Sequence, residues 1–81
     1  MSEDPVYLPK LGMQMQEATV VSWLVRPGDA IRSGQAICVI ETDKVETEIV
    51  ADVDGSLARI EVAEGDTAPV GAVLAVIDRS G

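Results

Sequence analysis

The side chain best suited to chemistry in this sequence is Lys44, one of two lysines among 81 residues. It lies in the segment E-T-D-K-V-E (41–46), between the apolar run 36–40 and the alternating run 45–50. This spacing predicts a hairpin with Asp43 and Lys44 as its two central residues. Because neither residue is glycine, the pattern favours a type I turn over the primed types, which require positive φ.

A lysine at a hairpin tip holds its amine on four methylenes, clear of the surface, where a modifying enzyme can acylate it. Acylation removes one positive charge, so the formal net charge would change from −8 to −9. An arm attached there would raise the concentration of its cargo to about the millimolar range at any site within reach. Lysines in exposed turns are also ordinary surface residues, so the position in a turn does not by itself establish a carrier.

Few other reactive groups are present. The sequence has no histidine and a single cysteine, Cys38, which argues against a transition-metal site, an internal disulfide and a catalytic triad. The apolar neighbours Ile37, Val39 and Ile40 predict that Cys38 is a buried small side chain and not a reactive thiol. We therefore expect neither a catalytic site nor a metal site in this chain.

The charge balance narrows the classes of partner. Fourteen acidic residues against six basic ones leave no basic footprint for nucleic acid, and they favour solubility or docking on basic proteins. No apolar run approaches the ~18 residues of a membrane span. The first residues, Met1–Asp4, are acidic and match neither a signal nor a transit peptide, so we expect a cytoplasmic location.

An internal repeat organises the sequence. When residues 23–41 are aligned with residues 60–78, an offset of 37, six of the nineteen pairs are identical, against one or two expected by chance. The pairs include Gly28 with Gly65, and we expect both glycines to adopt a backbone conformation that a side chain would strain. The pairing of Trp23 with Ile60 leads us to expect a substantially buried tryptophan.

Frequent glycines and prolines favour short strands over helices in this single small domain. Eight strands in two similar halves predict an all-β fold: a flattened β-sandwich of two four-stranded antiparallel sheets with quasi-twofold symmetry. The expected longer strands are Val6–Lys10, Thr19–Leu24, Ala36–Thr42, Val45–Val50, Ser56–Glu61 and Val73–Asp78, and the shorter ones are Asp29–Arg32 and Asp66–Val70.

The repeat also predicts where Lys44 lies. Shifting position 44 by 37 residues gives Tyr7 in one direction and Gly81 in the other. The chain ends should therefore occupy the symmetry-related position of the lysine turn, at the far end of the domain. This layout suits a tethered module whose working end faces away from its linker.

From about Val6 to Ile77, the sequence resembles the lipoyl domains of dihydrolipoamide acyltransferase components of 2-oxo acid dehydrogenase and acetoin-cleaving complexes. The family is a branch of the biotinyl/lipoyl carriers. The resemblance implies a flexible tail at 1–5, a lipoyl domain at 6–78 and the start of a linker at 79–81. The motifs that carry it are L-P-K-L-G-M (8–13), V-V-S-W-L-V (20–25), E-T-D-K (41–44), D-G (54–55) and G-D (65–66).

The resemblance implies that Lys44 carries lipoic acid as an amide, N6-lipoyl-lysine. The arm would accept an acyl group from a thiamin-diphosphate-dependent decarboxylase, deliver it to an acyltransferase site and be reoxidised by a dihydrolipoamide dehydrogenase. The domain itself would be a monomer without a catalytic site. The residues implied in shaping the turn or in recognition by a lipoylating enzyme and other partners are Glu41, Thr42, Asp43, Val45 and Glu46.

Two alternatives remain open at this stage, a biotin carrier and an unmodified interaction module, whereas these residues leave no room for the extra segments of the glycine-cleavage carrier. A biotin carboxyl carrier uses the same sandwich, but its lysine is typically flanked by methionines, whereas this chain has Asp43 and Val45. The glycine-cleavage carrier is longer and has extra helical segments. An unmodified interaction module would need no lysine chemistry, and the solvated charges Glu41 and Glu46 are compatible with it.

Overall fold

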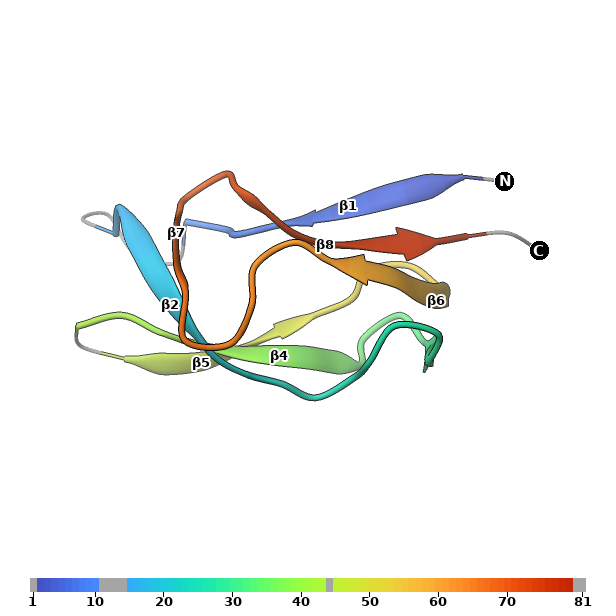
Figure 1. Cartoon of the computed structure of the whole chain (residues 1–81), viewed down its shortest axis with the longest axis horizontal. Coiled ribbons are helices and arrows are strands. Elements are labelled where there is room, and N and C mark those ends of the chain that lie inside the picture. Colours follow the sequence, from blue (N-terminus) through green and yellow to red (C-terminus); the bar gives the residue numbers. More distant parts are fainter. Residues whose placement is uncertain (1, 11–14, 44, 80–81) are drawn as a thin grey trace.

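The computed structural model describes residues 2–10, 15–43 and 45–79 (Figure 1). In this part of the chain every regular element is a strand, and no helix long and apolar enough to cross a membrane occurs. The strands are β1 (Glu3–Tyr7), β2 (Glu17–Trp23), β3 (Ala30–Ile31), β4 (Ala36–Glu41), β5 (Glu46–Val50), β6 (Gly55–Ile60), β7 (Thr67–Pro69) and β8 (Val73–Asp78).

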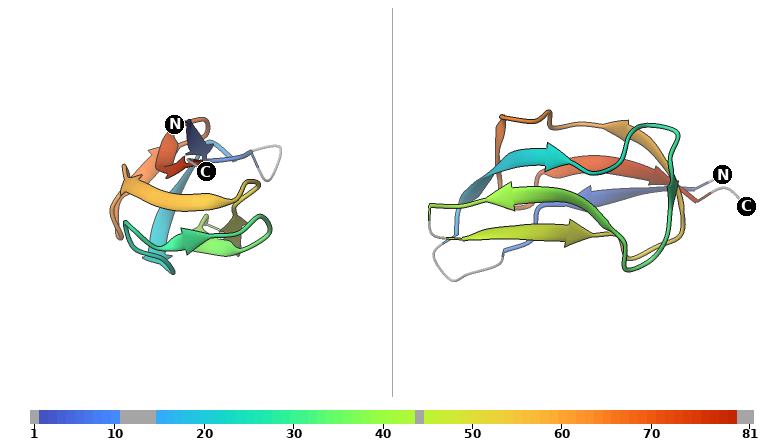
Figure 2. Two further views of the ribbon diagram at one scale, coloured as in Figure 1. Left: turned by 90° about the vertical axis from the view of Figure 1, so that its right-hand side faces the viewer. Right: turned by 90° about the horizontal axis from the view of Figure 1, so that it is seen from below.

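The strands form two antiparallel sheets that face each other, with orders β1-β8-β6-β3 and β5-β4-β2-β7. Figures 1 and 2 show the two layers running along the same long axis of a molecule that measures 38 × 20 × 19 Å. The predicted fold class, a flattened sandwich of two four-stranded sheets, is confirmed. Aliphatic side chains fill the interior, and those with 0% exposure are Ile37, Cys38, Ile40, Leu74, Ala75 and Ile77.

The first strand differs from the expectation. It covers Glu3–Tyr7 and not Val6–Lys10, so residues that we assigned to a flexible tail pair with β8, with Glu3 opposite Asp78. The strand can include Pro5 because it lies at the edge of its sheet, where the missing N–H removes no ladder hydrogen bond. The other strands lie within about two residues of their predicted bounds.

The hydrogen bonds repeat between the two halves. The Gly28 N–H donates to the carbonyl of Leu57 and the Gly65 N–H to that of Val20, both at 2.7 Å. Gly28 and Gly65 also have φ values of +96° and +88°, as the prediction of strained turns required. The strand orders match in the same way, since β5, β4, β2 and β7 correspond to β1, β8, β6 and β3. The internal repeat is therefore a quasi-twofold symmetry of the sandwich.

The quasi-twofold symmetry relates the structures at the two ends of the long axis to each other. The β4–β5 hairpin corresponds to the pair of β8 and β1, the last and first strands, so the two ends of the chain meet at the equivalent position. There the Arg79 N–H donates to the Ser2 carbonyl at 2.7 Å, and the Arg79 guanidinium lies 3.1 Å from the Asp4 carboxylate. Figures 1 and 2 show both chain ends at one end of the long axis and the β4–β5 hairpin at the other.

Candidate functional site

The β4–β5 hairpin closes around a short turn. The Thr42 N–H donates to the Val45 carbonyl at 2.8 Å, and the Val45 N–H donates to the Thr42 hydroxyl at 3.2 Å. Asp43 is therefore the first central residue of the turn. Among the described non-glycine residues none has positive φ, which excludes at Asp43 the primed turns that demand it. The side chain of Thr42 thus shapes the base of the turn.

Lys44, predicted to be the second central residue of the turn, lies outside the described residues. Its neighbours Asp43 and Val45 are both exposed, and Val45 keeps 54% of its surface accessible although it is apolar. Glu46 and Glu41 sit directly opposite each other at the base of the hairpin, and both are exposed. The predicted recognition residues are therefore grouped at one solvent-facing end of the molecule.

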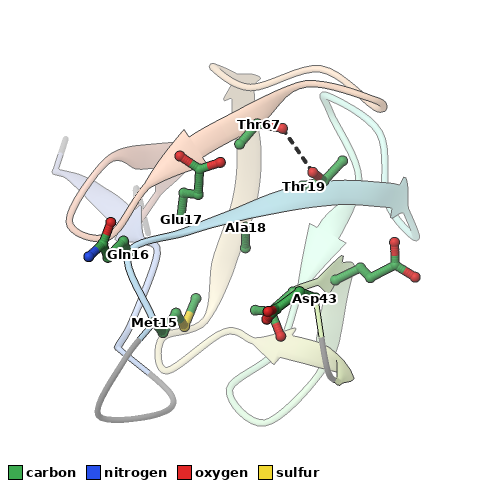
Figure 3. Close-up of a pocket in the computed structure, with 9 residues that line it drawn as sticks. Met15, Gln16, Glu17, Ala18, Thr19, Asp43 and Thr67 are labelled. Carbon is green, nitrogen blue, oxygen red and sulfur yellow. Dashed lines mark hydrogen bonds between the residues drawn. The ribbon is translucent and has the colours of Figure 1, made fainter.

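An open groove of about 570 Å³ runs beside this hairpin. One wall is the end of β4 and the following turn, including Asp43, and another is the segment that leads into β2, including Met15 (Figure 3). Across β2, the Thr19 and Thr67 hydroxyls are hydrogen-bonded at 2.8 Å, which joins β2 to β7. No pattern in the sequence predicts this groove, because it forms where segments distant in the chain meet.

The acidic pair at the hairpin differs from its symmetry mate. Glu41 and Glu46 correspond to Asp78 and Glu3 at the opposite end of the molecule, which also face each other across neighbouring strands. There the Arg59 guanidinium lies 3.3 Å from Glu3. The equivalent of Arg59 in the first half is Ser22, which carries no charge. The described part of the hairpin end therefore keeps an acidic surface that the other end neutralises in part.

The other candidate groups contribute to packing. Cys38 is fully buried, and burial raises the pKa of its thiol to about 12, so it is neutral and unreactive near neutral pH. Trp23 is partly buried and packs against the core like its repeat mate Ile60, as expected, and its indole N–H donates to the Val62 carbonyl at 2.8 Å. Within the described ranges, no group of three or more His, Cys, Asp or Glu side chains is placed to hold a metal ion.

Known proteins resemble this chain in both sequence and fold. Residues 4–77 match the biotin/lipoyl sequence family that is described as "Biotin-requiring enzyme". A chloroplastic dihydrolipoyllysine-residue acetyltransferase component of the pyruvate dehydrogenase complex of Arabidopsis thaliana is 38% identical over 89% of this chain and 15% of its own length. The corresponding component of Mycobacterium bovis is 42% identical over 90% of the chain and 13% of its own length.

A Bacillus subtilis acetyltransferase component of the acetoin cleaving system is 39% identical over 89% of this chain. The chain matches 18% of the length of that relative, so all three proteins are much longer. Among solved structures, the lipoyl domain of the 2-oxoglutarate dehydrogenase complex of Azotobacter vinelandii superposes with a TM-score of 0.78 and 35% identity, covering 95% of this chain and 98% of that one. Urea carboxylase of Kluyveromyces lactis shares the fold at 22% identity, with a TM-score of 0.80 over 96% of this chain and 6% of its own.

Proposed function

Because this chain belongs to the biotin/lipoyl attachment-domain family, we propose that it is a lipoyl carrier domain with Lys44 as the attachment residue. The observation that carries the proposal is the placement of the β4–β5 hairpin. The residues on either side of Lys44 are exposed at the end of the molecule opposite the chain ends. The relatives that match over nearly the whole chain are named dihydrolipoyllysine acyltransferase components, which favours lipoate over biotin.

The surroundings of the turn fit a covalently attached lipoyl group. An amide on the lysine nitrogen needs no coordinating side chains, only an amine that a ligating enzyme can reach. The exposed flanks Asp43 and Val45 leave that approach open. The bond between the Thr42 N–H and the Val45 carbonyl holds together the two residues at the base of the turn, which gives an attached arm a defined base.

Lipoate, when attached, supplies a dithiolane that carries acyl groups and electrons between active sites. The work of this chain would be to present the arm and to be recognised. Glu41 and Glu46 would offer negative charge to basic surfaces on the partner enzymes, and Asp43 and Val45 would be read by the lipoylating enzyme. Catalysis would then lie outside this chain, in a thiamin-diphosphate-dependent decarboxylase, an acyltransferase site and a dihydrolipoamide dehydrogenase.

The experiment is intact-mass analysis after production in a host that makes both lipoate and biotin. We expect the mass to rise by one lipoyl group, and peptide mapping to locate it on Lys44. Lys44→Arg should abolish the modification, whereas Lys10→Arg, the matched control at the other lysine of the chain, should leave it intact.

Two other outcomes would contradict the proposal. Addition of one biotin, detected with streptavidin, would make the domain a biotin carrier. If the chain stays unmodified in the presence of a lipoate ligase and lipoate, while circular dichroism shows that it is folded, the carrier function is wrong and an interaction module is the better description.

A further inference from the structure

We propose that the free edge of β5 is a docking edge, on which a partner protein adds an extended, basic segment as a fifth strand of the β5-β4-β2-β7 sheet. This inference is independent of any modification of Lys44. It follows from the backbone of the edge, from its charges and from a groove that lies between this edge and that of β1.

The four edge strands of the sandwich are protected to different degrees. Unpaired edges invite pairing with another chain, and natural proteins blunt them with proline, bulges or short length. Strand β3 has two residues, β7 has three and includes Pro69, and β1 contains Pro5 and an irregular register at Tyr7. Strand β5 has five residues and contains neither proline nor glycine. Its edge is therefore the one best able to accept a further strand among the described residues.

The hairpin identifies which backbone groups of β5 face outward. Thr42 and Val45 form a hydrogen-bonded pair, and such pairs alternate along an antiparallel ladder with pairs whose backbone groups point away. The next pair, Glu41 with Glu46, and the pair of Val39 with Glu48 are therefore not hydrogen-bonded. The N–H and C=O groups of Glu46 and Glu48 point to the free edge.

The internal symmetry provides a natural comparison for this edge. Glu48 faces Val39 in one sheet, and Pro5 faces Val76 in the other, where Val39 and Val76 are repeat mates. Pro5 is therefore the structural equivalent of Glu48. At that position β1 has lost the donor that a docking strand would need, whereas β5 keeps it. Because the same fold accepts a proline at the equivalent position of β1, the free N–H donor of Glu48 is a feature of the β5 edge that the fold does not require.

Charge indicates what kind of segment would dock. Glu46 and Glu48 are exposed, and because they are two residues apart their side chains lie on the same, outer face of β5. No ion pair with them is found in the part of the chain that the structure describes, whereas Glu3, the mate of Glu46, is paired with Arg59. Lysines or arginines two residues apart on an added strand would lie opposite the two carboxylates, and such cross-strand pairs are stabilising.

A groove of about 400 Å³ lies between the edges of β5 and β1 and would receive the other side chains of the segment. Its lining includes the apolar side chains of Val6, Tyr7 and Val50, of which Tyr7 is 56% and Val50 is 53% exposed, together with Glu48 and Asp52 at the β5 edge. Side chains on an added strand alternate between faces. The segment would therefore place its basic residues outward and apolar residues over the groove.

A second copy of this chain is a poor occupant. Pairing two β5 strands would bring Glu46 and Glu48 of one copy next to the same residues of the other, and like charges across a ladder are destabilising. The acidic net charge of −8 adds repulsion between copies. The occupant is instead an extended segment of another protein with basic and apolar residues in alternation.

The test uses the unmodified Lys44→Arg protein, labelled with ¹⁵N, and two blocked peptides, one of alternating lysine and valine and one of alternating glutamate and valine. We expect the lysine peptide to shift the amide signals of Glu46 and Glu48 and to slow their hydrogen exchange. The glutamate peptide should do neither. Added salt should weaken the response, because exposed charges are screened.

Three variants distinguish backbone pairing at the β5 edge from nonspecific electrostatic attraction to the acidic surface. Glu48→Pro should abolish the slowed exchange and leave the domain folded, because Pro5 occupies the equivalent position. Glu48→Gln should keep the pairing but weaken it roughly two- to fivefold. Asp66→Lys, beside β7 at the opposite edge, is a charge control that should leave the protection of β5 unchanged. Shifts spread over all acidic surfaces, unchanged binding by Glu48→Pro, or no binding by the lysine peptide would overturn the proposal.

Discussion

Replacing Gly28 or Gly65 with alanine is expected to destabilise the domain by backbone strain alone. Both glycines occupy the third position of a four-residue turn, in which the Asp29 N–H donates to the Arg26 carbonyl in one half and the Asp66 N–H to the Ala63 carbonyl in the other. Their φ values of +96° and +88° correspond to type II turns, which require positive φ at this position.

The size of the effect follows from the empty space around both residues. Apart from the two neighbours in the chain, a Cβ added at Gly28 or Gly65 would meet no atom within 4 Å, so no clash with another part of the domain contributes. The remaining cost, that of holding an L-residue at positive φ, is about 1–2 kcal/mol. For a domain of this size, 1 kcal/mol corresponds to a change of about 6 °C in melting temperature. We therefore expect each variant to melt roughly 6–12 °C lower than the parent.

Thermal unfolding followed by circular dichroism, together with urea titrations, measures this loss. Asparagine tolerates positive φ better than alanine, so Gly28→Asn and Gly65→Asn should recover part of it. The two halves should respond alike, since their turns share the same hydrogen bonds. Alanine variants that melt within about 1 °C of the parent, or asparagine variants that melt lower than the alanine ones, would refute the explanation by strain.

Three further predictions concern the core and its margins. Trp23→Phe removes the indole N–H that donates to Val62 and should cost about 1 kcal/mol in urea unfolding, and an unchanged free energy would contradict the role of that bond. Cys38 should resist thiol reagents at pH 8 until the protein is unfolded; because burial raises the pKa of its thiol from 9.0 to about 12, stability should be constant below pH 9 with respect to this group and should fall as the pH rises toward 12. Gly55→Ala would place a Cβ against the Asp78 carbonyl, so we expect it to lower the free energy of unfolding by more than Gly28→Ala, and equal losses would show that the strand ends can shift to accommodate it.

The periodicity and the repeat predicted most of this fold, because each strand is set by short apolar runs between turn residues. The repeat also predicted the equal turns at Gly28 and Gly65 and the position of the chain ends. The start of β1 at Glu3 was missed, since an acidic opening that includes Pro5 has little strand character by itself. It is a strand because β8 is buried and needs a partner on that side.

The sequence also did not predict the irregularities in strand pairing. The register shifts between Ala36 and Cys38 in β4, so Ile37 and Cys38 are both fully buried although they are adjacent in a strand. A strict two-residue alternation would have exposed one of them. The groove beside the hairpin was likewise unpredicted, because it is lined by residues such as Met15 and Thr67 that are far apart in the chain.

The meeting of both chain ends at one corner has a mechanical consequence. Any polypeptide that continues from either end pulls on the same small region, which is fastened by the bond between Arg79 and Ser2. The domain then behaves as a rigid lever on a single pivot, with a length close to its 38 Å long axis. A rotation at this pivot would carry the hairpin through an arc with a radius close to that length, so motion of the whole domain would move the hairpin even while its own turn keeps its shape.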